Sequence, residues 1–197
     1  VLGSFSQTSD LNPGGSVAEF TEAGEGDIFL LSLTTLGDYV WAVAIGATQW
    51  DKPDSIAVDN ESGIYVTGTF SSTVDFDPGP GVAELSESFA EHAFVLKLND
   101  SGTYQWARSI GGASHSWGEA VEITSDKTVY VAGLYTGGAT FDPSVPAAPL
   151  GGYLSAYVMA LDTAGNFVGV NMFHQAGGDS AAFALASASL AWASAVR

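Results

Sequence analysis

One unit of about 65 residues recurs along the chain, and it limits the possible folds more than any other feature. Gly3-Ser4-Phe5 returns as Gly68-Thr69-Phe70 and again as Gly133-Leu134-Tyr135, a step of 65 residues each time. The other landmarks keep the same step, with Asp10-Leu11-Asn12-Pro13-Gly14 matched by Asp75-Phe76-Asp77-Pro78-Gly79 and Trp41-Ala42 by Trp106-Ala107. A fixed period of this size indicates a modular array, in which each unit buries its apolar face against a neighbouring copy.

Four short strands fill the best preserved copy. Residues 55–58 and 64–70 are rich in β-branched and aromatic residues and flank an Asx/Gly turn at 59–63, where Gly63 is expected to adopt a positive φ. A long excursion over 75–88 leads to a second hairpin, whose strands at 93–98 and 104–110 flank a turn at 99–102. The sequence therefore predicts an all-β β-propeller with four-stranded antiparallel blades of about 65 residues.

The copies divide the chain into four predicted parts. We expect a partial blade of outer strands over 1–49, full blades over 50–115 and 116–178, and over 179–197 the start of a further, atypical blade or a frayed Ala-rich tail. Because propellers need about four to eight blades, the ring is expected to be incomplete. Further blades of the same polypeptide are therefore expected, and we interpret the chain as a fragment.

Charge and composition exclude several function classes. The chain of 197 residues has 22 acidic and five basic residues, a formal net charge of −17. Such a surface repels nucleic acid and anionic lipid, so we expect neither as a partner. No run of 18 apolar residues occurs, so membrane insertion is not expected. Cysteine is absent, which excludes disulfides, thiol catalysis and thiolate metal sites.

The repeat also resembles a known family. The segments 64–70, 75–79 and 93–98, with Trp106-Ala107, resemble the bacterial SBBP β-propeller repeat, and the resemblance spans most of residues 1–175. Such repeats occur in large secreted or surface proteins of bacteria. The resemblance therefore implies an extracellular or cell-envelope location.

Two interpretations fit the acidic motif that follows the second strand of each repeat. Asp75 and Asp77 stand two residues apart, so in an extended chain they project to one side and offer oxygen ligands that suit Ca²⁺. A short polar side chain before Pro-Gly is also what a structural turn needs. The candidate metal ligands are Asp75, Asp77, Asp10, Asn12 and Asp142, and Ca²⁺ is the only cofactor that they suggest.

Tryptophans supply the candidate ligand-binding residues. Trp41 and Trp106 recur one period apart within strands, so they are expected to pack between blades. Trp50 and Trp117 fall in the expected connections between repeats, where loops carry function, and they are the candidates for ligand contact. His92, His115 and His174 lie at different places in the repeat, so they do not predict a metal centre.

The leading functional hypothesis is a non-enzymatic, extracellular β-propeller scaffold that binds a protein or a carbohydrate. Rigid blades would hold variable loops, and a partner would dock across several of them. Two alternatives stay open: a hydrolase or lyase built on the propeller face, and a calcium-stabilised adhesive repeat array. No nucleophile elbow, phosphate loop or zincin helix is present to favour an enzyme.

Overall fold

The described part of the chain is built from β-strands. A computed structural model describes residues 1–87, 90–112, 114–142 and 154–173, and no helix occurs among them. The predictions for 179–197 and for His174 therefore lie outside the described residues. The strands are β1 (Leu2–Phe5), β2 (Thr8–Asp10), β3 (Glu19–Thr21), β4 (Asp27–Leu33), β5 (Tyr39–Ile45), β6 (Lys52–Val58), β7 (Ile64–Phe70), β8 (Thr73–Asp75), β9 (Glu84–Ser86), β10 (His92–Leu98), β11 (Tyr104–Gly112), β12 (Ser116–Ile123), β13 (Thr128–Tyr135), β14 (Ala139–Thr140), β15 (Ser155–Asp162) and β16 (Phe167–Phe173).

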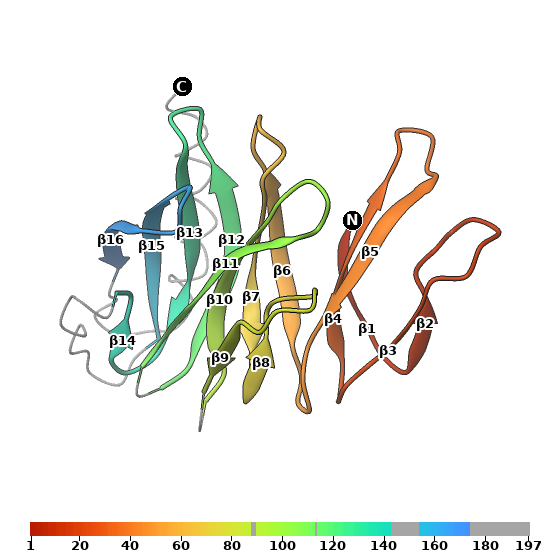
Figure 1. Ribbon diagram of the computed structural model, residues 1–197. Helices are drawn as coiled ribbons and strands as arrows, with labels where there is room; N and C mark the ends of the chain where they lie inside the picture. Colours follow the sequence, from red (N-terminus) through yellow and green to blue (C-terminus); the bar gives the residue numbers. More distant parts are fainter. Residues whose placement is uncertain (88–89, 113, 143–153, 174–197) are drawn as a thin grey trace.

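Three antiparallel sheets follow one another in chain order (Figure 1). The first sheet has the order β1-β4-β5, the second β14-β11-β10-β7-β6, and the third β12-β13-β15-β16. The second sheet has five strands because β14 joins the end of β11 through Gly111 and Gly112. The all-β, antiparallel prediction is thus confirmed, whereas uniform four-stranded blades, a closed ring and the predicted domain boundaries stay predictions.

Each long excursion of the first two copies contains a small sheet that the sequence did not predict. β2 pairs with β3, and β8 pairs with β9. β8 begins and ends one period after β2, and β9 begins and ends one period after β3. Strands of three residues are too short to show a hydrophobic period. In the second excursion, the buried Val74 and Phe76 anchor the small sheet of β8 and β9 in the core.

The sheets pack face to face, and the core lies between them. One cluster joins Ile28 and Leu30 of the first sheet to Phe94 and Leu96 of the second. Another joins Val95 of the second sheet to residues of the third. Both faces of β10 are therefore buried, which explains its nearly continuous apolar sequence.

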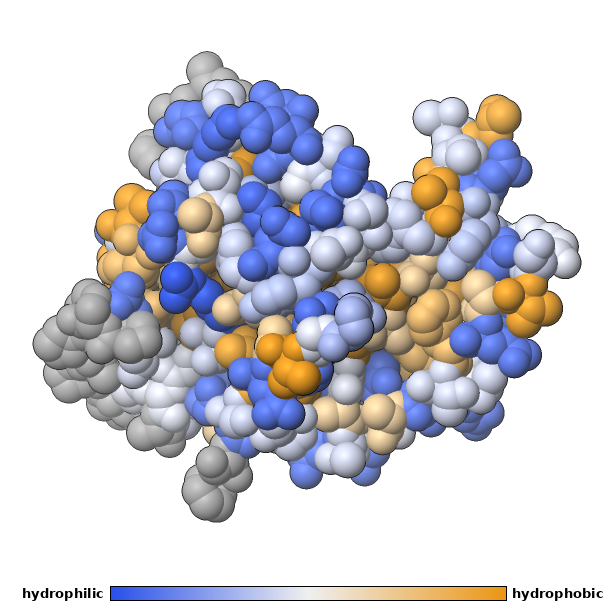
Figure 2. All heavy atoms as spheres, viewed as in Figure 1, coloured by the Kyte–Doolittle hydropathy of each residue, from blue (hydrophilic) through white to orange (hydrophobic). Residues whose placement is uncertain are grey.

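The surface differs from sheet to sheet. Figure 2 shows hydrophilic residues over the hairpin ends at the top of the second and third sheets, whereas apolar residues gather to the right, around β4 and β5. Burial of apolar area is the main stabilising contribution to folding. The first sheet thus leaves more of this area in contact with water.

Five hairpin turns share one hydrogen-bonding pattern. In each, the first residue donates its N–H to the carbonyl of the fifth, and the N–H of the fourth donates to the carbonyl of the first. The fourth residue has a positive φ, and it is Ser62, not the predicted Gly63, in the 59–63 turn. Gly63 is needed for a different reason, since a Cβ there would lie 2.7 Å from Asp59 Oδ2. The turns begin at Thr34, Asp59, Asn99, Thr124 and Asp162.

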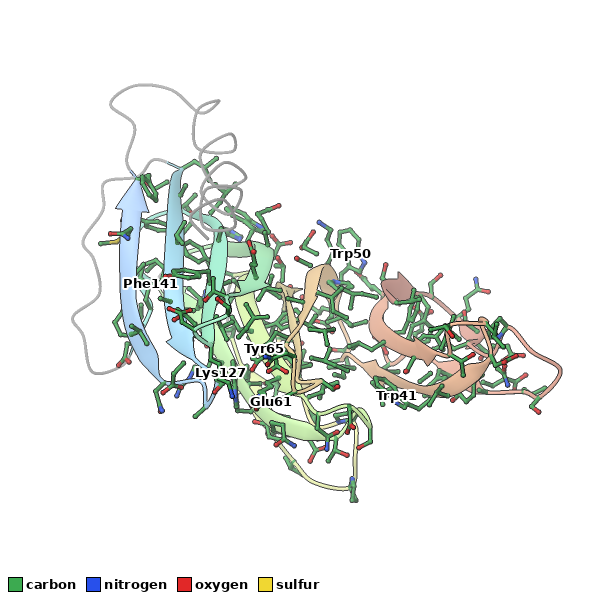
Figure 3. All side chains as sticks on the ribbon, turned by 90° about the horizontal axis from the view of Figure 1, so that it is seen from above. Trp41, Trp50, Glu61, Tyr65, Lys127 and Phe141 are labelled. Carbon is green, nitrogen blue, oxygen red and sulfur yellow. The ribbon has the colours of Figure 1, made fainter. Side chains whose placement is uncertain are left out.

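One tryptophan joins the first sheet to a hairpin of the second, and another joins the second sheet to a hairpin of the third. Trp41 Nε1 donates to Asp100 O at 2.9 Å, and Trp106 Nε1 donates to Thr163 O at 3.1 Å. Each indole covers the glycine of the turn that it contacts, Gly102 or Gly165, closely enough that a Cβ there would lie within 3.2 Å of ring carbons. We call this arrangement the tryptophan latch. It confirms that Trp41, labelled in Figure 3, and Trp106 pack between sheets.

Candidate functional site

A polar cavity lies at the end of the sheets opposite the hairpin turns. Its volume is about 460 Å³, within the range of small-molecule sites. Four segments form its wall: the connection before β6, the residues after β7, the residues before β10 and the connection before β12. Five of the seven lining residues lie in loops of the second sheet, and Gln49 and His115 lie in the connections that join this sheet to the first and third sheets. The cavity is lined by Gln49, Ser71, Ser72, Glu87, Ala90, Glu91 and His115.

Trp117 supports the cavity wall without lining it. Its Nε1 donates to Glu91 Oε2 at 2.9 Å, and its indole stacks on the His115 ring with centroids 5.6 Å apart and planes 3° from parallel. Trp117 is the second residue of β12, so the prediction that it lies in a connection is wrong. Its ligand-binding role stays a prediction, and His115, on which the indole stacks, lines the cavity in place of Trp117.

Trp50 lies in the connection before β6, as predicted, and is 54% exposed (Figure 3). Its indole rests on Gly26, where a Cβ would lie 2.8 Å from Cδ1 of the ring. The neighbouring Gln49 lines the cavity, whereas Trp50 itself does not. An exposed indole beside a polar cavity is a suitable contact for a sugar ring or an aliphatic side chain.

His92, the first residue of β10, connects two segments of the cavity wall. Its Nδ1 lies 2.8 Å from Glu87 Oε2, and its Nε2 lies 3.0 Å from Ser114 O. The ring is buried, 2% exposed, so these polar contacts form away from water. This histidine therefore positions the segment before β10 against the segment before β12.

Charge gives the cavity a definite chemical character. Two of its lining residues are glutamates and none is a lysine or arginine, so it suits hydrogen-bond donors and disfavours anions. Ser72 has a positive φ of 65°, and its buried hydroxyl has no partner among the described residues. Another polar lining group, the imidazole of His115, accepts a hydrogen bond at Nδ1 from Glu91 N at 3.3 Å.

Asp51 is a buried carboxylate at the base of the connection before β6. Its Oδ2 accepts from Ala47 N at 2.8 Å and its Oδ1 from Ser71 N at 3.2 Å. Burial raises the pKa of Asp51 to about 6, with the negative charge of Asp27 acting in the same direction and the two hydrogen bonds opposing it. The side chain thus ties the first connection to the cavity residue Ser71.

Asp51→Asn is expected to flatten the pH dependence of stability. Because the pKa of Asp51 is raised on folding, the folded chain holds a proton between about pH 4 and 6 that the unfolded chain releases. The free energy of unfolding therefore falls as pH rises through this window, by up to about 3 kcal/mol from this group. The amide that replaces the carboxyl group does not titrate, so urea unfolding between pH 4 and 7 should show a smaller decline in the variant.

Asp162→Asn is the matched control for this prediction. The Asn166 hydrogen bonds lower the pKa of Asp162, so its stabilisation is present above about pH 4 and is lost only as pH falls below that value. This variant should parallel the parent between pH 4.5 and 7. An Asp51→Asn profile that also parallels the parent would contradict the assignment.

The candidate metal ligands form turns in the structure. Asp75 Oδ1 accepts from Asp77 N and Ala83 N, and Asp77 Oδ1 accepts from Gly79 N. Asp10 and Asn12 make the matching bonds in the first copy, and two of these hydrogen bonds, from Ala18 N and Asn12 N, lower the pKa of Asp10. Asp142, part-buried, follows β14 in the third copy.

These bonds give the turn interpretation a physical basis. No three His, Asp or Glu side chains converge as a metal centre anywhere in the described ranges. Phe76, between the two aspartates, is fully buried and packs edge-on against Phe70 at 5.4 Å. The motif therefore pins the excursion to the core, and calcium binding by its residues stays a prediction.

The fold and site together define a class: an all-β repeat protein of stacked antiparallel sheets with a polar cavity among its connections. No protein-family model matches the chain, so the SBBP resemblance stays a prediction. The chain is similar to an uncharacterized WD repeat-containing protein of Acanthamoeba polyphaga mimivirus, 28% identical over 135 residues that cover 63% of this chain and 10% of that protein. It is also similar to the regulatory protein FlaEY of Caulobacter vibrioides, 28% identical over 143 residues that cover 73% of this chain and 15% of that protein.

The first similarity is consistent with a repeat protein of the β-propeller type, because WD repeats form propeller blades. The chain spans about a tenth to a seventh of the length of these relatives. Nothing long and apolar enough to be a membrane-crossing helix is found in the described segments.

Proposed function

We propose that the chain is part of a non-enzymatic β-propeller scaffold at the cell surface or outside the cell, and that it binds a carbohydrate in the polar cavity. The cavity carries this proposal, because loops of the second sheet and the two connections that flank this sheet line it together. The face-to-face packing of the sheets and the WD-repeat similarity support the propeller. The extracellular location follows from the family resemblance alone.

The lining favours a neutral or amino sugar as the ligand. Carboxylate, amide and hydroxyl groups accept and donate hydrogen bonds to sugar hydroxyls, and the exposed Trp50 beside the cavity offers a stacking surface. A uronic or sialic acid would meet Glu87 and Glu91 without a guanidinium or ammonium partner. A basic protein is the second candidate partner, supported by the excess of 22 acidic over five basic residues.

Binding to a printed array of neutral, amino and acidic oligosaccharides tests this function. We expect the chain to bind neutral or amino sugars and to leave acidic ones. His115→Ala removes a lining side chain and should weaken that binding by about tenfold, a change of about 1.4 kcal/mol.

Leu36→Ala is the control, since Leu36 is exposed on a hairpin at the other end of the sheets. It should bind like the parent. Absence of binding to every sugar class, or equal binding by His115→Ala and the parent, would reject the cavity as a carbohydrate site.

A further inference from the structure

The interface between sheets repeats with the sequence. On β10, Phe94, Leu96 and Leu98 face the first sheet and are at most 1% exposed. On β15, the matching Tyr157, Met159 and Leu161 face the second sheet and are equally buried. Each sheet thus uses the same alternate positions of the same strand to dock on the sheet before it.

The first sheet has apolar residues at the same strand positions, but no preceding sheet of the described residues buries them. One period before Phe94, Leu96 and Leu98 stand Phe29, Leu31 and Leu33, and all three are only partly buried. They lie on the face away from the second sheet, since Ile28 and Leu30 of the same strand pack against that sheet. We call the face of Phe29, Leu31 and Leu33 the open face.

The hairpin of the first sheet also has a latch position without a tryptophan. The turn at 34–38 has the same hydrogen bonds as the turns at 99–103 and 162–166, and Gly37 has a φ of 88° like Gly102 and Gly165. Whereas indoles cover Gly102 and Gly165, a Cβ built at Gly37 meets no atom of the described residues within 4 Å, apart from those of its two chain neighbours. The adjacent Leu36 is 87% exposed.

A second copy of this chain is a poor occupant. The third sheet carries Gly169 where the second carries Trp106, because Gly169 pairs with Ala160 as Trp106 pairs with Lys97. A neighbour docked through that sheet would bring no indole to Gly37. A sheet that covers the open face and also contacts Gly37 must therefore be a sheet of this repeat with tryptophan at the position of Trp41.

We propose that the open face docks a further repeat sheet of the same polypeptide, and that this sheet latches its tryptophan over Gly37 onto the Thr35 carbonyl. The proposal continues an interface that occurs twice in the structure. It rests on the propeller arrangement proposed above and is independent of ligand binding in the cavity. Failure of the carbohydrate experiment would leave it unaffected.

An in-register duplication tests the docking directly. A second copy of residues 1–65 placed before Val1 extends the chain by one period, since Val1 occupies the position of Val66. The added copy supplies a sheet with Trp41 and an inner strand, equivalent to β6, for the first sheet. The full chain of 197 residues is kept.

Cysteine reactivity reports whether the face is covered, because the chain has no cysteine of its own. Leu31→Cys, introduced in the original copy, should react readily with a thiol reagent in the parent chain and at least about tenfold more slowly in the extended chain. Val168→Cys is the control, since Val168 is 63% exposed on the third sheet and should react equally in both. Trp41→Phe in the added copy alone should restore part of the Leu31→Cys reactivity.

Three results would overturn the proposal. One is equal Leu31→Cys reactivity in the parent and extended chains. Another is an extended chain that does not fold, because a matching repeat should be accepted by the open face. The third is a parent chain that sediments as a dimer with Leu31→Cys protected, which would assign the face to a second copy.

Discussion

Gly68→Ala and Gly133→Ala are each expected to cost about 3 kcal/mol or more of stability. A Cβ at Gly68 would lie 2.1 Å from Lys52 O, and one at Gly133 would lie 2.0 Å from Trp117 O. Both oxygens belong to the backbone of the neighbouring inner strand, so no side-chain rotation relieves the clash. Overpacking of this kind must move a strand, which exceeds the usual cost of an added methyl group. Urea unfolding measures the effect.

Gly3→Ala is the matched control at the same position of the repeat. Its Cβ would meet the Phe29 ring at 2.6 Å and no backbone atom within 4 Å among its nearest contacts. A ring on the partly buried open face can turn aside, so this variant should lose clearly less stability than the other two. Equal losses at all three glycines would show that the inner-strand carbonyl is not the cause.

Trp106→Ala is expected to lower stability by about 3 kcal/mol. The substitution removes an indole that packs in the cluster between the second and third sheets, beside Tyr65, and leaves a cavity there. It also removes the hydrogen bond to Thr163 O. Because the latch spans two sheets, chemical denaturation should show the third sheet unfolding before the second.

Trp106→Phe separates the hydrogen bond from the packing. The phenyl ring keeps much of the apolar contact but has no donor for Thr163 O, so a loss of about 1 kcal/mol is expected. Val168→Ala, on the same strand as Gly169 and largely exposed, should change stability by less than about 0.5 kcal/mol. A Trp106→Phe loss as large as that of Trp106→Ala would contradict a packing role for the indole.

The repeat predicted the large elements well because their signals are local. Turns at 59–63 and 99–102 and the flanking strands occur as expected, since Asx and glycine residues punctuate runs with high β propensity. Trp41 and Trp106 recur one period apart, and that recurrence identified them as packing residues. The short strands β2, β3, β8 and β9 escaped because three residues show no periodicity.

The site was harder to predict because it is assembled from separate segments. Trp50 and Trp117 lie at the same end of the sheets as the cavity, but the residues that line the cavity are Gln49, the neighbour of Trp50 in sequence, and Glu91 and His115, which Trp117 contacts. Ser71, Ser72, Glu87 and Glu91 fall in segments without a motif, and the pairing of β7 with β10 in the second sheet brings them together. The positive φ at Ser62 was missed because a turn's composition does not say which residue takes the left-handed conformation.

The five hairpin turns with one hydrogen-bonding pattern lie at one end of the sheets, which we call the hairpin rim, and the excursions lie at the other end, the excursion rim. The two rims should therefore differ in how readily they accept insertions during evolution. At the hairpin rim, each turn closes in five residues with the same internal hydrogen bonds, so an insertion there would break a fixed geometry. At the opposite end of the sheets, the length of the excursion varies. The third excursion is two residues shorter than the second, since the equivalent residues Phe94 and Tyr157 are 63 residues apart and not 65. New specificities should therefore accumulate by insertion and drift at the excursion rim, while the hairpin rim keeps its length across descendants.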